Sequence, residues 1–169
     1  YLKIAEGCSR NCSFCIIPKI RGKQSSRTID DVVTEAKRLG ASGVKEIILV
    51  AQDMTSYGID LDPRNNQDYL ERLLLRLEEA DLEDVEWVRM LYMYPWNFTD
   101  QLLEILQEGE KVLPYVDMPL QHVNKRILRS MRRNITRDKQ MELIGRIRAV
   151  DEMVLRTTFI TGYPGETDE

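Results

Sequence analysis

The sequence predicts an α/β fold in which parallel strands alternate with helices, forming a partial parallel (β/α) barrel of about five strands. Two observations support this prediction. Short apolar runs recur along the 169 residues, and between them lie longer stretches with apolar side chains at helical spacing. Strands that alternate with helices build βα units, whose strands pair in parallel through right-handed crossovers. The length suffices for one domain with a sizeable core.

The first half of the chain contains three of the expected strands. Residues 2–7 form a short, partly apolar run, residues 47–51 read as a buried parallel strand, and residues 87–93 are strand-like. Thr28 is expected to cap a helix that Gly40 and Gly43 end. A second helix follows from a leucine stripe at Leu70, Leu73, Leu74 and Leu77. The polar stretch 56–67 predicts a loop over the active face.

The second half adds two strands and three helices. Thr99 is expected to cap a helix that carries Leu102, Leu103 and Leu106 and ends near Gly109. Residues 112–118 predict a fourth strand, weakened at its start by Pro114, and residues 154–161 a fifth. Two further helices should begin at Asn124 and Thr136, the second with an apolar stripe of Met141, Ile144 and Ile147.

Composition excludes some functions. The net charge of −4 gives no electrostatic case for nonspecific nucleic-acid binding. No apolar run approaches the ~18 residues that span a bilayer, and we expect a cytoplasmic protein without membrane contact. Because the chain begins at Tyr1 and ends just after a glycine-rich turn, we expect it to be a piece of a longer polypeptide.

The three cysteines of the chain, Cys8, Cys12 and Cys15, lie within eight consecutive residues with the spacing C-x3-C-x2-C. A four-iron cluster usually takes four thiolates. Three would leave one iron open to bind and activate a substrate. A zinc site needs four ligands, but there is no second cysteine pair and the single histidine, His122, is distant in sequence. The odd number argues against a disulfide framework.

Polar residues follow the other strands at the edge where ligands bind in parallel α/β folds. For Gln52, Asp53 and Gln121 we favour ligand contact. For residues 94–95 we favour turn chemistry. His122 has no partner pattern for nucleophilic catalysis and is interpreted as structural.

Basic residues near the cysteines and farther along the chain have two interpretations. Arg27 is our choice for pairing with a cofactor carboxylate. Arg126, Arg129 and Arg133 would share a solvated helix face, with a docking site for RNA or a ribosomal partner as the alternative.

Taken together, these motifs resemble the methylthiotransferases among the radical SAM enzymes. The match runs in order through essentially the whole chain. It comprises E-G-C-x3-C-x2-C with I-P and R-G (residues 6–22), S-R (26–27), P-L-Q-H (119–122), I-L-x-x-M-x-R (127–133) and G-Y-P-G-E-T (162–167). The resemblance implies a radical SAM core domain over residues 1–169, of the (β/α)6 family type and truncated after about five strands.

Two branches of this family differ in substrate. One modifies an adenosine in transfer RNA, and the other modifies an aspartate of small-subunit ribosomal protein S-twelve. The sequences at residues 51–53, 56–58, 92–95 and 121–122 resemble the ribosomal-protein branch. The resemblance therefore favours a protein substrate, with a tRNA methylthiotransferase core and a non-enzymatic cysteine metal-binding module as alternatives.

The resemblance also implies a mechanism. Cys8, Cys12 and Cys15 would hold a 4Fe–4S cluster whose open iron is chelated by S-adenosyl-L-methionine. Reductive cleavage would give a 5′-deoxyadenosyl radical that takes a hydrogen from the aspartate β-carbon before methylthiolation. No catalytic residue is assigned beyond the cluster ligands. The implied cofactor contacts are Phe14 (adenine), Gln52 and Asp53 (amine), Arg27 (carboxylate), and Gln121 with the turn from Gly162 to Glu166 (ribose and adenine).

The family further implies partners and domains that this sequence lacks. The partners are the small ribosomal subunit and an electron donor such as flavodoxin or ferredoxin. Family members also carry an amino-terminal domain with a second 4Fe–4S cluster and a carboxy-terminal TRAM domain. We therefore expect this chain alone not to complete methylthiolation, and expect its truncated barrel to leave a sheet edge or apolar surface exposed.

Overall fold

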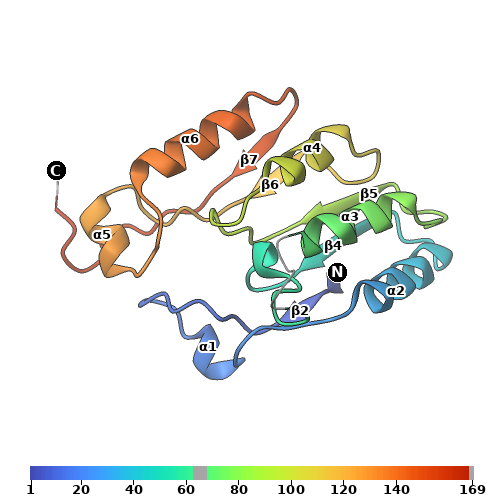
Figure 1. Ribbon diagram of the computed structural model, residues 1–169, viewed down its shortest axis with the longest axis horizontal. Coiled ribbons are helices and arrows are strands. Elements are labelled where there is room, and N and C mark those ends of the chain that lie inside the picture. The colour runs from blue at the N-terminus through green and yellow to red at the C-terminus, as the bar shows by residue number, and fades with distance from the viewer. Residues whose placement is uncertain (63–67, 168–169) are drawn as a thin grey trace.

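Parallel strands in sequence order form the centre of the fold. The computed structural model describes residues 1–62 and 68–167 (Figure 1). Strands β1 (Leu2–Lys3), β4 (Glu46–Val50) and β5 (Trp87–Met90) make one parallel sheet, and β6 (Tyr115–Asp117) pairs in parallel with β7 (Val154–Arg156). A parallel bridge between Val88 and Val112 joins the two groups. Successive parallel strands are therefore neighbours, which confirms the predicted α/β architecture of a partial barrel wall.

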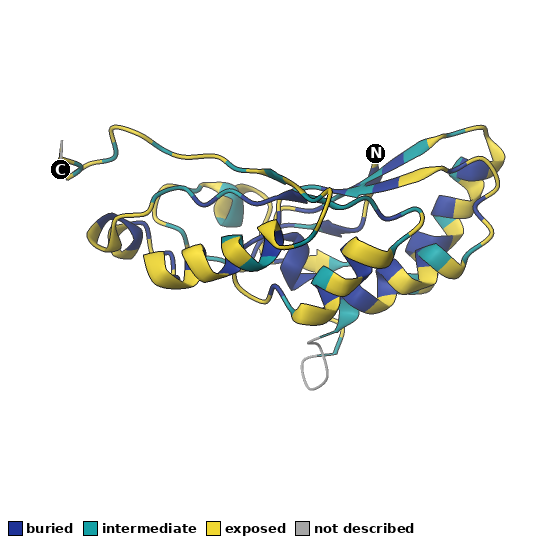
Figure 2. Ribbon diagram, turned by 90° about the horizontal axis from the view of Figure 1, so that it is seen from above, coloured by how far each residue is buried: buried dark blue, intermediate teal, exposed yellow. Residues whose placement is uncertain are grey.

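Helices cover one side of these strands (Figure 2). They are α2 (Ile29–Ala41), α3 (Tyr69–Glu79), α4 (Asp100–Glu108), α5 (Lys125–Ser130) and α6 (Arg137–Arg148). The leucine stripe of α3 is fully buried, as predicted. On β4, Ile47 and Leu49 are buried while Ile48 is only partly covered. The strand thus has one well-covered face, rather than the two expected from its continuous apolar run. No helix in the described part of the chain is long and apolar enough to cross a membrane.

Side chains cap the helices where the sequence predicts. Thr28, Thr99 and Thr136 each accept a hydrogen bond from the backbone N–H three residues later. Asn124 accepts from the N–H groups of residues 126 and 127. These bonds satisfy donors that the first helical turn cannot satisfy itself.

The predicted apolar stripe of α6 is partly wrong. Ile147 is buried and Ile144 is partly buried against the core, but Met141 is 55% exposed. The buried face instead carries Gln140, Leu143 and Ile147. Gln140 belongs there because its side-chain amide donates to the backbone oxygen of Leu120 at 3.4 Å. A hydrophobicity pattern cannot identify a polar residue that is buried to make such a bond.

The first predicted strand divides into two. After β1, the chain enters β2 (Ala5–Glu6), which pairs antiparallel with β3 (Ser25–Ser26). Gly7 then turns the chain with φ +77°, and a Cβ at this position would lie 2.3 Å from the backbone oxygen of Lys23. The short pair β2–β3 thus closes the base of a loop that contains all three cysteines and a short helix, α1 (Ile17–Ile20), which the sequence analysis did not predict.

Three strands are shorter than predicted, for local reasons. β5 ends at Met90 because Tyr92 adopts a left-handed conformation, φ +62°, and donates its N–H to the Asp117 carboxylate at 3.1 Å. β6 begins only after Pro114, which has no N–H to donate. β7 ends at Arg156, although a parallel bridge between Gln121 and Phe159 extends the pairing beyond it.

The predicted loop 56–67 starts inside the core rather than on the surface. Met54–Ser56 form a short 3-10 helix, η1, and all three residues are buried. The Tyr57 side chain is also buried, and its hydroxyl donates to the backbone oxygen of Arg27 at 2.7 Å. Residues 63–67 of this loop lie outside the described residues.

A buried carboxyl on α3 gives a testable prediction about stability. The Glu71 side chain is almost fully buried and accepts a hydrogen bond from the Thr99 hydroxyl. Burial raises the pKa of Glu71 above its ordinary value. Because folding favours the protonated form, stability falls as pH rises from the pKa of the unfolded chain through the raised pKa of the folded state.

We therefore expect Glu71→Gln, which keeps an acceptor for Thr99, to melt a few degrees higher than wild type at pH 7. The two proteins should converge below the pKa of the unfolded carboxyl. Thermal melts across this pH range test the expectation. A lower Tm for the variant at pH 7 would mean that the ionised carboxylate stabilises the fold.

Candidate cofactor and metal site

The cysteine loop is fixed at its base and folded back on itself. Cys8 is buried, and its N–H donates to the backbone oxygen of Gly22 at 3.1 Å. Cys12 and Cys15 are half-exposed, and the N–H of Cys15 donates to the oxygen of Cys12 at 3.1 Å. All three thiols are free. Burial raises the pKa of the Cys8 thiol, so a metal that binds this sulfur must displace its proton.

These cysteines line a cavity of about 160 Å³ at the carboxyl ends of the parallel strands. The structure brings Phe14, Gln52, Asp53 and Gln121 to the same cavity as Cys8, Cys12 and Cys15. The remaining lining residues come from the ends of other elements: Arg10, Tyr92, Met93, Tyr94, Pro119 and Arg133. The predicted convergence of strand ends on the cysteine loop is therefore present for most of the predicted residues.

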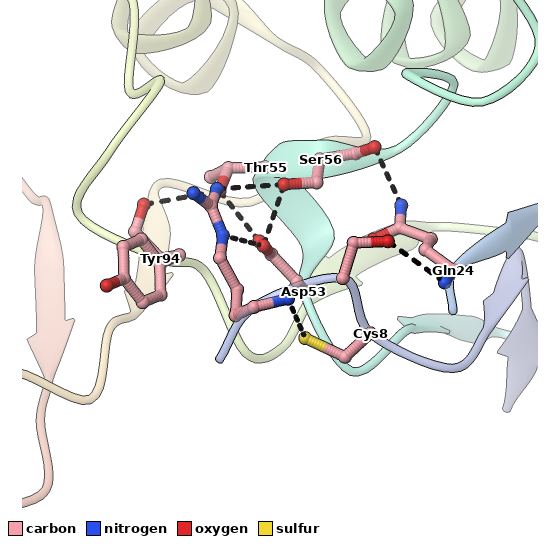
Figure 3. A network of polar contacts seen from close by, with 8 residues as sticks. Cys8, Gln24, Asp53, Thr55, Ser56 and Tyr94 are labelled. Atoms are coloured by element: carbon pink, nitrogen blue, oxygen red, sulfur yellow. Dashed lines mark hydrogen bonds and ion pairs between the residues drawn. The ribbon is translucent and has the colours of Figure 1, made fainter. Parts of the chain in front are cut away.

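Asp53 anchors the cysteine loop to the end of β4. Its carboxylate accepts from Arg10 Nε at 2.6 Å, from the Ser56 hydroxyl at 2.7 Å and from the Thr55 hydroxyl at 2.9 Å. Arg10 Nη2 also donates to the Ser56 hydroxyl at 2.9 Å, and the N–H of Arg10 donates to Cys8 Sγ at 3.4 Å. The network reaches from Asp53 to the first cysteine (Figure 3). The Asp53 carboxylate, predicted to meet a cofactor amine, is thus already engaged.

Tyr94 contacts two arginine side chains at this cavity. The guanidinium carbons of Arg10 and Arg133 lie 4.3 Å and 4.0 Å from the centre of its ring. Such contacts are attractive because the aromatic face carries negative charge. Tyr94 is 8% exposed, and burial raises the pKa of its hydroxyl. Our preference for simple turn chemistry at residues 94–95 missed this role.

Arg27 is held away from the cavity, which it does not line. Its Nε lies 2.7 Å from the Asp31 carboxylate and its Nη1 lies 2.6 Å from the Glu35 carboxylate. Nη1 also donates to the backbone oxygen of Lys3 at 2.9 Å. Arg27 therefore ties the start of α2 to β1 in this structure, and the predicted contact with a cofactor carboxylate has no support here.

The turn of residues 162–166 also lies outside the cavity lining. Glu166 accepts from the N–H of Tyr163 at 2.9 Å and lies 3.2 Å from His122 Nε2. His122 is thus hydrogen-bonded, as expected of a structural histidine. The turn contacts the cysteine loop indirectly, because the hydroxyls of Tyr163 and Ser13 lie 2.9 Å apart. Gly162 and Glu166 therefore shape this turn without reaching the cavity.

The expectation of a solvated Arg133 is wrong. Arg126 and Arg129 are exposed, but Arg133 is 7% exposed and lines the cavity. Helix α5 ends at Ser130, and Arg132 has a left-handed conformation, φ +56°. The three arginines do not share one helix face, since the helical spacing stops before residue 133.

The cysteine arrangement suits a cluster better than a single ion. In the described part of the chain, no three His, Cys, Asp or Glu side chains converge as a site for one metal ion. A zinc ion needs its four ligands at bonding distance from one centre. In a four-iron cluster each thiolate binds a different iron, so the sulfurs stand apart around a common volume. Three free cysteines around one cavity match that requirement.

The fold and this cysteine loop define a radical SAM core. The family model described as "Radical SAM superfamily" matches residues 2–169. The chain belongs to the radical SAM superfamily.

Its curated relatives narrow the comparison. The chain is 48% identical over 171 residues to the "Ribosomal protein uS12 methylthiotransferase RimO" of Caldanaerobacter subterraneus subsp. tengcongensis, covering 100% of this chain and 38% of the relative. It is 49% identical over 171 residues to the protein of the same name from Christiangramia forsetii, covering 100% and 37%. The chain thus spans less than two fifths of the length of these relatives.

Solved structures share the fold. TsrM from Kitasatospora setae, a radical S-adenosylmethionine methyltransferase with cobalamin and a 4Fe–4S cluster bound, has a TM-score of 0.76 at 17% identity. The match covers 98% of this chain and 31% of TsrM. OxsB, a cobalamin-dependent S-adenosylmethionine radical enzyme, has a TM-score of 0.72 at 12% identity over 94% of this chain and 23% of that chain. These likenesses confirm the architecture.

Proposed function

We propose that this chain is the cluster-binding core of a methylthiotransferase that acts on an aspartate of ribosomal protein uS12 (S-twelve). The observation that carries the proposal is the convergence of Cys8, Cys12 and Cys15 with the carboxyl ends of the parallel strands on one cavity. The identity of 48% to a uS12 methylthiotransferase, over the full length of this chain, supports the reaction class and the substrate.

In this proposal Cys8, Cys12 and Cys15 hold a 4Fe–4S cluster with S-adenosyl-L-methionine beside it. When bound and reduced, the cluster supplies the electron that cleaves the cofactor. Phe14 offers an aromatic surface for adenine, and the exposed Gln52 and the half-buried Gln121 offer amide groups to the polar parts of the cofactor. Arg10 and Asp53 hold the loop in place. The protein's task is to orient the cofactor and to exclude water from the reacting centre.

Other parts of the proposal lie beyond this chain. The three cysteines suffice for one cluster only. We therefore assign sulfur delivery to a second cluster in another domain, and substrate docking on the small ribosomal subunit to a TRAM domain. Flavodoxin or ferredoxin would supply electrons. A ribosomal substrate places the reaction in the cytoplasm.

The substrate assignment is tested by offering the full-length enzyme uS12 and a transfer RNA in parallel and weighing both products. We expect uS12 to gain the mass of one methylthio group in place of a hydrogen, and the RNA to be unchanged. A matched uS12 with asparagine at the target aspartate should stay unmodified. A modified RNA with unmodified uS12 would instead assign the core to the tRNA branch.

A further inference from the structure

Arg133 is a buried cation with no acidic partner. It lines the cavity shared by the cysteines, and only 7% of it is exposed. Within residues 1–62 and 68–167, no carboxylate lies within ion-pair distance of its guanidinium. Buried charges in proteins are normally paired, because water that would solvate them is excluded. An unpaired arginine at a ligand cavity therefore suggests that the ligand supplies the missing charge.

The hydrogen-bond donors of Arg133 point the same way. Nη2 donates to the backbone oxygen of Pro119 at 2.6 Å, and the face of the guanidinium contacts the Tyr94 ring. Nε is buried and has no acceptor, and Nη1 makes no hydrogen bond to the described part of the chain. Arginine thus has donors left over, although its planar fork is suited to bind two oxygens at once.

The charges around the cavity leave Arg133 uncompensated. Arg10 also lines the cavity, but its charge is cancelled by the carboxylate of Asp53 at 2.6 Å. Apart from the cysteines, Arg133 is then the remaining charge among the lining residues. Arg27, the residue predicted to meet a carboxylate, is occupied by Asp31 and Glu35.

We propose that Arg133 binds a carboxylate that enters this cavity. The proposal rests on the proposed function, which brings two such groups: the methionyl carboxylate of the cofactor and the side chain of the target aspartate. The shared chemistry is a charge-assisted pair between guanidinium and carboxylate. The Tyr94 ring and the Pro119 oxygen fix the guanidinium, so the arginine is held in place before the ligand binds.

The test compares four reconstituted proteins: wild type, Arg133→Met, Arg133→Lys and the matched control Arg129→Met. Arg129 is an exposed arginine on nearby α5 and does not line the cavity. Iron content per chain is measured first. Equilibrium dialysis then gives the affinity for S-adenosyl-L-methionine, and for a uS12 peptide with the target aspartate against the same peptide with asparagine.

We expect Arg133→Met to weaken carboxylate binding about 10- to 100-fold, as for loss of a charge-assisted hydrogen bond, with Arg129→Met unchanged. If the cofactor supplies the carboxylate, its affinity falls while the preference for aspartate over asparagine stays. If the substrate supplies it, the preference disappears while cofactor affinity stays. Arg133→Lys keeps the charge but loses the fork, so a smaller loss is expected.

Other outcomes overturn the proposal. Equal cofactor affinity and equal peptide preference in Arg133→Met at normal iron content would make Arg133 purely structural. Lower iron content with unchanged affinity per cluster would place its charge at the cluster instead. If Arg133→Met does not fold, unchanged binding by Arg133→Lys overturns it. A wild-type protein that takes up no iron would overturn the proposed function, which the iron measurement detects separately.

Discussion

Cys12→Ala is expected to abolish cluster assembly and the cleavage of S-adenosyl-L-methionine. The chain has only three cysteines, all in one loop, so no other thiol can take the place of the lost ligand. Cys12 is half-exposed and contributes little to the core, so the fold should remain. Anaerobic reconstitution followed by iron analysis should find the variant with only background iron, against about four irons per chain in wild type.

The neighbouring Asn11 offers a matched control. Its side chain is exposed within the same loop, so Asn11→Ala changes the loop without removing a thiolate. We expect this control to keep its iron. A Cys12→Ala protein that assembles a cluster as well as the control does would contradict the assignment of Cys12 as a ligand.

Asp53→Ala is the second substitution for which a large effect is expected. Asp53 is 3% exposed, and its carboxylate accepts hydrogen bonds from Arg10, Thr55 and Ser56. Its removal leaves the partly buried guanidinium of Arg10 without its counter-ion. Breaking a buried pair from one side costs about 3–5 kcal/mol, and the 27% exposure of Arg10 places the expected loss near the lower end. Urea unfolding measures this loss.

The same substitution should also loosen the cysteine loop, because Arg10 lies between Cys8 and Cys12. We expect Asp53→Ala to release iron from the reconstituted protein faster than wild type. Adding Arg10→Met should recover part of the stability, since the unpaired charge is then gone. Asp151→Ala, at an exposed position, serves as the control. A fully additive double variant would show that the two side chains do not act as a pair.

The sequence predicted those parts of the fold that depend on local patterns. The α3 leucine stripe, the four helix caps and the alternation of strands with helices all arise from residues close together in the chain, and the structure confirms them. The three cysteines were equally accessible to prediction because their spacing is local. Strand ends were less predictable, since the tertiary bond from Tyr92 to Asp117 ends β5.

The residues that the sequence analysis missed act through long-range contacts. Arg133 has helical spacing from Arg126 and Arg129, but α5 stops at Ser130 and the chain turns residue 133 into the cavity. Its contact with Tyr94 joins residues 39 positions apart. Arg27 illustrates the converse. Its position next to α2 is predictable, but its ion pairs with Asp31 and Glu35 depend on the side-chain geometry. The short spacing to Asp31 was a signal that favoured a structural role.

The account's central claim is that the cavity beside Cys8, Cys12 and Cys15 holds a 4Fe–4S cluster that cleaves S-adenosyl-L-methionine. The most direct measurement is anaerobic reconstitution of the protein with iron and sulfide, followed by the cofactor and dithionite, with quantification of 5′-deoxyadenosine. The account predicts a brown protein that releases 5′-deoxyadenosine only when both the cofactor and the reductant are present. A colourless protein that retains zinc and binds no S-adenosyl-L-methionine would contradict it.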